Sequence, residues 1–159
     1  MRRRRRTWRE RGQSLAEFAI IFPVVAWLVF GLVDMARAMQ SYLTIQAGAR
    51  DAARYAVTGR IDCTGVAIQN RDNCIVQQVK NRVKDLNNAS TITITYRSWD
   101  YPNYSDPPTE NNAGQQCDAV EVEVNYSYKP MTPILKSIVS AVPMKAKERL
   151  VNEPYGTCS

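Results

Sequence analysis

Residues 12–33 read GQSLAEFAIIFPVVAWLVFGLV. The 19 residues from Leu15 to Val33 carry one charge, the carboxylate of Glu17. As a helix they would span roughly 28 Å, close to the thickness of the hydrocarbon core of a bilayer. We therefore predict a membrane-spanning helix, kinked at Pro23. Glu17 is a candidate functional residue, because an ionisable side chain in such a segment costs several kcal/mol unless it finds a partner.

A basic leader precedes this segment. Residues 1–12 hold seven arginines and one acid, whereas the chain from Gln13 onward has 14 basic and 14 acidic residues. The net charge of +6 therefore belongs to the leader, and an RNA- or DNA-binding arm is the disfavoured alternative. Cations directly before an apolar segment hold the N-terminus in the cytoplasm. We expect one membrane span, over residues 15–33, with residues 59–159 on the far side of the cytoplasmic membrane.

The helical pattern continues past the apolar segment. Residues 34–57 lack proline, and Thr58-Gly59 offers a stop, which predicts one helix of about 45 residues. Small residues recur along its second half at four-residue spacing, a pattern that lets another element approach the backbone closely. That element is either the chain's own domain or another subunit. The residues concerned are Gly48, Ala49, Ala52, Ala53 and Ala56.

Residues 59–159 have the pattern of a small mixed domain. Residues 119–128 alternate strictly between apolar and polar side chains, as do residues 91–96, so both segments are predicted strands. Residues 144–151 form a weaker third strand, whose cations could lie opposite Glu121 and Glu123. An amphipathic helix is predicted over residues 75–86, and another begins at Thr132-Pro133. The fold class is α+β: a long N-terminal helix, about three antiparallel strands and two short helices.

Four cysteines follow the apolar segment, on the side predicted to be exported: Cys63, Cys74, Cys117 and Cys158. An even number of cysteines in such a domain favours disulfides. Their spacing and the absence of histidine argue against a metal site, and no cofactor is expected. Antiparallel pairing of the last two strands would bring Cys117 toward Cys158, leaving Cys63 and Cys74 to close the preceding loop. The other two connectivities remain open.

The connection over residues 97–116 is too long for an ordinary hairpin. It contains Trp99, Tyr101 and Tyr104 among several prolines. These aromatic side chains either cover the sheet as a lid or contact a partner; the lid is the favoured interpretation.

The N-terminal helix resembles that of TadE-like minor pilins (pseudopilins) of the tight-adherence, or Flp, type IV pilus system. The matching stretches are RGQSLAEF at residues 11–18, FP at 22–23, FGLVD at 30–34 and ARDAARYAV at 49–57. The resemblance implies cleavage between Gly12 and Gln13 by a prepilin peptidase. It also implies a mature helix over residues 13–58, in which Glu17 pairs with the freed amine of a neighbouring subunit. The implied partners are the peptidase, other pilin or pseudopilin subunits, and the Tad inner-membrane assembly machinery.

Two other classes of protein compete with this interpretation. Residues 1–38 could serve as a signal peptide ending at Ala36-Arg37-Ala38, or as an uncleaved anchor, for a disulfide-bonded protein. An enzyme is disfavoured, because the sequence has no histidine for a conventional nucleophilic site and no phosphate-binding glycine loop. The N-terminal residue of the mature protein separates the readings: Gln13 for a pilin, Met39 for a signal peptide, Met1 or Arg2 for an anchor.

Overall fold

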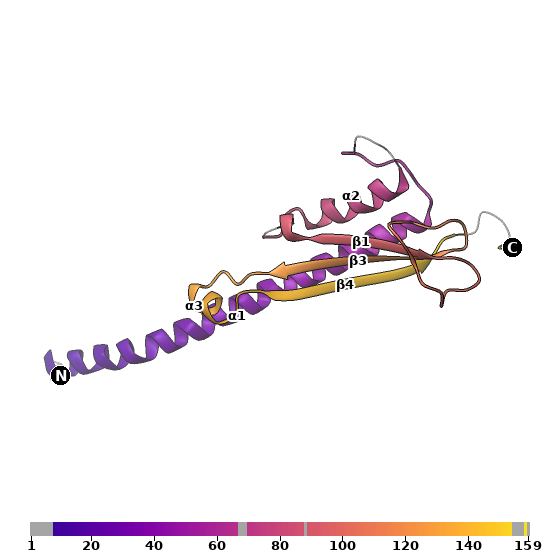
Figure 1. The fold of residues 1–159 in the computed structure, drawn as a ribbon. Coiled ribbons are helices and arrows are strands. Elements are labelled where there is room, and N and C mark those ends of the chain that lie inside the picture. Colours follow the sequence, from indigo (N-terminus) through magenta and orange to yellow (C-terminus); the bar gives the residue numbers. More distant parts are fainter. Residues whose placement is uncertain (1–7, 67–69, 88, 154–157, 159) are drawn as a thin grey trace, which may run out of the picture.

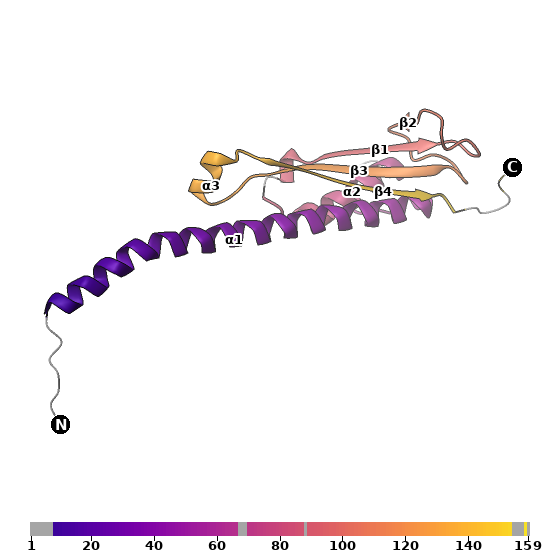
Figure 2. The ribbon, with the colours of Figure 1, turned by 90° about the horizontal axis from the view of Figure 1, so that it is seen from below.

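The computed structural model describes residues 8–66, 70–87, 89–153 and 158. Its longest element is helix α1, Trp8–Val57, with 50 residues. The predicted continuous helix is thus confirmed, and it already begins within the basic leader. Figure 2 shows α1 curving away from the rest of the molecule toward its N-terminal end, in the half that contains Pro23.

A four-stranded antiparallel sheet lies along the C-terminal half of α1 (Figure 1). The strand order is β2-β1-β3-β4, and the strands are β1 (Thr93–Trp99), β2 (Thr109–Glu110), β3 (Ala119–Tyr128) and β4 (Val142–Val151). The bounds of β3 agree with the prediction, whereas β4 starts two residues before the predicted position. Strand β2 was not expected. It pairs with the end of β1 inside the segment treated as a long connection.

The two predicted short helices are present, together with a 3₁₀ turn over Ala89–Thr91. Helix α2 spans Arg71–Val83, so the predicted range of 75–86 is displaced toward the C-terminus. The reason is a cap: the side chain of Asn70 accepts a hydrogen bond of 2.8 Å from the backbone N–H of Asn73. Helix α3 spans Pro133–Ile138 and begins at Thr132-Pro133 as predicted.

The core lies between one face of the sheet and helices α1 and α2, as the two views of Figures 1 and 2 show. Val120, Val122 and Val124 of β3 are fully buried, and they meet Ile45 of α1 and Val79 of α2 in a single apolar cluster. Because apolar and polar residues alternate along β3, the apolar side chains all lie on one face of the strand, and this face supplies the centre of the core.

The small residues of α1 pack beneath the chain's own domain. Ala49, Ala52, Ala53 and Ala56 are at most 1% exposed. A Cβ atom at Gly48 would lie 3.6 Å from carbon atoms of Arg82, Val79 and Val83, so α2 approaches the helix closely here. The intramolecular alternative is therefore the one that the structure supports for this ladder.

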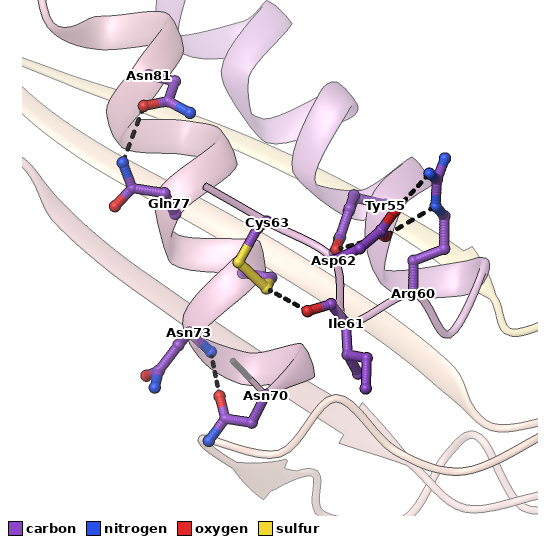
Figure 3. The surroundings of a disulfide bond; sticks show 10 residues. Tyr55, Arg60, Ile61, Asp62, Cys63, Asn70, Asn73, Gln77 and Asn81 are labelled. Atoms are coloured by element: carbon purple, nitrogen blue, oxygen red, sulfur yellow. Dashed lines mark hydrogen bonds and ion pairs between the residues drawn. A yellow bond between two sulfur atoms is a disulfide. The ribbon is translucent and has the colours of Figure 1, made fainter. Parts of the chain in front are cut away.

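Two disulfides hold the ends of the domain. Cys63–Cys74 joins the segment after α1 to the first turn of α2, and Cys117–Cys158 joins the residue pair before β3 to the C-terminal segment. This is the pairing favoured from the sequence. Figure 3 shows the first disulfide beside Asp62, which Arg60 and Tyr55 approach from the end of α1.

Candidate processing and assembly site

The predicted processing and assembly residues lie together at the exposed start of α1. Gly12, Gln13 and Glu17 are all exposed. Gln13 and Glu17 share one helix face, and Gln13 Nε2 donates a hydrogen bond of 3.2 Å to Glu17 Oε1. Apart from its chain neighbours and the backbone of its own helix, no described atom lies within 4 Å of a Cβ built on Gly12. A chain that began at Gln13 would therefore have its α-amine about one helical turn from an accessible carboxylate.

The apolar stretch that follows is exposed around the whole helix. Ile20 is 74% exposed and Leu28 is 65% exposed. Among the described residues, one helix is long and apolar enough to cross a membrane, and it is this one. A core helix of a water-soluble domain would bury such side chains within the protein, whereas here the chain's own domain leaves them uncovered.

Asp34 marks the point where the apolar stretch ends and the domain begins. Its side chain is buried, and its carboxylate accepts hydrogen bonds from the backbone N–H groups of Met131 at 3.2 Å and Thr132 at 3.1 Å. The hydroxyl of Tyr128 donates to the Asp34 carbonyl oxygen at 3.2 Å. These bonds fix the connection between β3 and β4 to α1 one residue after Val33.

A second polar cluster, built on the half-buried Arg71 and the buried Asn152, holds the other end of α1. Arg71 donates to the carbonyl oxygen of Ala56 at 2.8 Å, to that of Gly114 at 2.7 Å and to Asn152 Oδ1 at 2.7 Å. The amide of Asn152 in turn donates to the carbonyl oxygen of Ala113 at 3.1 Å. One guanidinium thus joins the end of α1, the loop before β3 and the end of β4. Sequence reasoning missed Arg71, because its partners are distant in the chain.

The outer face of the sheet carries a compact ion network. Glu123 Oε1 lies 2.6 Å from Lys145 Nζ, and Glu123 Oε2 lies 3.0 Å from Lys147 Nζ and 2.8 Å from Arg97 Nη2. The predicted cross-strand cations are confirmed. Although Glu123 lies on the polar face of β3, it is only 7% exposed beneath the longer cationic side chains.

The ion network lowers the pKa of the Glu123 carboxyl. Burial on its own raises the pKa of this carboxyl, but hydrogen bonds from Lys145, Asn125 and Lys147 outweigh that effect and lower the pKa to about 2. Glu123 is therefore ionised throughout the physiological range and has the properties of a structural ion-pair partner. The neighbouring Glu121 accepts from Arg97 at 2.7 Å.

Two of the three aromatic side chains in residues 97–116 fold back onto the domain. The Arg149 guanidinium carbon lies 3.8 Å from the ring centroid of Trp99, a cation–π contact. The hydroxyl of Tyr104 donates to the Cys117 carbonyl oxygen at 2.6 Å. Because Trp99 is the last residue of β1 and part of the sheet itself, the lid interpretation fits Tyr104 alone, and Tyr101 remains 44% exposed.

Fold and site together define a class: an α+β protein whose small domain is carried on a helix able to cross a membrane. Residues 12–54 match the family model described as TadE-like protein. The matched region contains Gly12, Gln13, Glu17 and the apolar stretch, and over these residues the chain is similar to TadE-like proteins, in agreement with the sequence resemblance. No curated protein and no solved structure matches the chain. The domain after residue 54 is thus described by its own structure alone.

Proposed function

We propose that this protein is a TadE-like minor pilin, or pseudopilin, that takes part in assembling a type IVc (Flp/Tad) pilus for surface adherence. The observation that carries the proposal is the exposed Gly12, Gln13 and Glu17 set at the start of an apolar helix, within the TadE-like match. The proposed organisation is a leader at residues 1–12, a helix at 13–58 that spans the membrane once, and an extracytoplasmic domain at 59–159. The basic leader favours a cytoplasmic N-terminus.

Processing removes the leader between Gly12 and Gln13. This bond lies inside α1, and a peptide bond in a regular helix is shielded by its own hydrogen bonds, so the turn around Gly12 opens before cleavage. Glycine lowers the cost of opening, because it is about 1 kcal/mol less favourable in a helix than alanine. A prepilin peptidase is the proposed enzyme, acting at the cytoplasmic side of the membrane.

Assembly then pairs two charges. The new α-amine at Gln13 is a cation, and Glu17 is an exposed anion in the apolar surroundings of Leu15 and Phe18. In lipid either charge alone is costly, whereas the amine of one subunit and the carboxylate of its neighbour neutralise each other. The proposed partners are therefore other pilin or pseudopilin subunits, delivered by the Tad inner-membrane machinery.

The contacts of Asp34 disfavour the signal-peptide alternative. Cleavage after Ala38 would remove Asp34 and leave the N–H groups of Met131 and Thr132 without the carboxylate that binds them. It would also remove Ala38, which packs against the core cluster. The domain is thus built around residues that a signal peptidase would discard.

The N-terminal residue of the membrane-bound protein tests the proposal. Coexpression with an active prepilin peptidase should give a chain that begins at Gln13, as read by mass spectrometry. Gly12→Leu should remain uncut, with Met1 or Arg2 first. The matched control is Gly31→Leu in the same helix, which should be cut normally, since both glycines have free space for a side chain.

Two results would contradict the proposal. A wild-type chain that begins at Met39 would establish a signal peptide. A wild-type chain that stays intact beside an active peptidase would establish an uncleaved anchor.

A further inference from the structure

The connection between β3 and β4, residues 129–141, forms the end of the domain that faces the apolar half of α1. In both Figures 1 and 2, α3 lies at the end of the sheet nearest the N-terminal half of α1. The hydrogen bonds from Met131 and Thr132 to Asp34 fix this connection at the boundary of the apolar stretch. We refer to residues 129–142, which include the first residue of β4, as the α3 loop.

The α3 loop exposes a group of apolar side chains. Ile138 is 69% exposed, Met131 54%, Val142 38% and Val139 37%. Ile138 ends α3 and Val139 follows it, so the apolar side chains at the C-terminal end of this short helix are turned outward, although such side chains normally pack onto their own domain. Four exposed apolar side chains within one short segment indicate an uncovered contact surface.

Both charged residues of the α3 loop itself are lysines. The sequence from residue 124 to residue 147 contains four lysines and no aspartate or glutamate. Lys129 and Lys136, in the loop itself, are exposed. The nearest carboxylate, Asp34, already accepts hydrogen bonds from the loop backbone. Exposed lysines beside apolar side chains are typical of segments at a membrane surface, where the stems lie along apolar groups and the ammonium ions reach the phosphates.

We propose that the α3 loop inserts into the headgroup region of the bilayer leaflet on the domain's side of the membrane. Ile138, Val139 and Met131 enter the boundary of the acyl chains, and Lys129 and Lys136 bind anionic phospholipid headgroups. The inference rests on the proposed membrane span of α1, with which this surface is continuous. A symmetric contact with the same loop of a second copy is less favourable, because it brings lysines against lysines.

The loop gives the domain a second attachment to the bilayer. The helix alone would let the domain rotate and tilt about the end of the span. A shallow contact at the α3 loop fixes the orientation of the sheet relative to the membrane plane before the subunit is taken into a filament.

Depth measurements on the full chain test this proposal. A nitroxide label is attached to a single added cysteine, and the oxidised protein is reconstituted in vesicles of phosphatidylcholine and phosphatidylglycerol. Ile138→Cys reports on the loop, Leu28→Cys on the span, and Thr109→Cys on exposed strand β2. The ratio of accessibility to oxygen over a water-soluble nickel complex should be several-fold higher at position 138 than at 109, and highest at 28.

Each of the other outcomes overturns a stated part of the proposal. A label at position 138 that matches position 109, while position 28 is in lipid, overturns the α3 proposal alone. A water-accessible label at position 28 overturns the membrane span and, with it, the proposed function. A label at 138 that is shielded from both reagents, with spectral broadening that disappears on dilution with unlabelled chain, establishes contact with a second copy and overturns the lipid contact.

A charge-reversal pair tests the headgroup contact separately. Lys136→Glu, added to Ile138→Cys, should lower the oxygen-to-nickel ratio at position 138 in these anionic vesicles. Lys84→Glu, an exposed site at the end of α2, is the matched control and should leave the ratio unchanged. An unchanged ratio in Lys136→Glu would overturn the role of the lysine.

Discussion

Two charged residues, the buried Asp34 and the half-buried Arg71, position the domain on its helix. Asp34 and Arg71 act near the two ends of the contact between α1 and the domain, and each satisfies backbone groups that would otherwise be buried without partners. Glu123 acts on the outer face of the sheet, where it gathers cations from two strands. Truncating Asp34 or Arg71 costs more than removing an exposed ion pair, because several backbone groups lose a charged hydrogen-bond partner at once.

Arg71→Met should destabilise the domain by on the order of 3 kcal/mol, because two carbonyl oxygens and Asn152 lose a charged donor. Denaturant unfolding of the purified protein in detergent, followed by near-ultraviolet circular dichroism, measures the change. The control is Arg60→Met, which removes a solvent-exposed pair with Asp62 and should barely move the midpoint. Equal effects of the two substitutions would contradict the role given to Arg71.

The depressed pKa of Glu123 makes stability depend on pH in the acid range. A carboxyl with an ordinary pKa of 4.5 in the unfolded chain and about 2 in the folded chain contributes stability above pH 4.5. That contribution is lost as the pH falls from 4.5 toward 2. As the pH falls over this range, the free energy of unfolding should decrease more steeply for the wild type than for Glu123→Gln. If the two proteins gave parallel curves of unfolding free energy against pH, the ion network would contribute nothing to stability.

At the scale of elements, periodicity predicted β3, but it missed β2, which depends on a distant pairing, and it misplaced the start of α2, which a local cap decides. Strand β3 was placed correctly because its alternation matches a one-sided core. Strand β2 has only two residues and no pattern of its own, and it exists because β1 offers it a free edge. Helix α2 was displaced because the apolar stripe begins at Ile75, whereas the Asn70 cap starts the helix four residues earlier.

Asn70→Ala should lower the stability of the domain by about 1 kcal/mol, since the N–H of Asn73 loses its acceptor. Hydrogen exchange of the first turn of α2 should quicken in parallel. In the same helix, Asn81→Ala is the comparison: it is exposed, alanine is the better helix former, and the substitution should be close to neutral. If Asn70→Ala were as harmless as Asn81→Ala, the cap would have no energetic role.

At the scale of the whole molecule, the two halves of α1 lie in different environments. Its first half is apolar and uncovered, and its second half lies under the sheet and α2. The sequence was sufficient for the apolar first half of α1, for the continuous helix and for the α+β class, because these depend on hydropathy and short-range spacing, whereas it left open what covers the second half of α1. It was insufficient for Arg71 and for the role of Asp34, whose partners lie far away in the chain.

Incorporation of Glu17 variants into filaments is the most direct test of the central claim. Wild type and variant are coexpressed in cells that carry a Tad pilus system, and their ratio in sheared filaments and in membranes is measured by mass spectrometry. Glu17→Ala should be cut to begin at Gln13 yet be depleted several-fold from filaments, because the neighbouring amine has no partner in lipid. Ile20→Ala, an exposed apolar truncation in the same segment, should be incorporated normally. A Glu17→Ala chain incorporated as well as wild type would contradict assembly through this carboxylate.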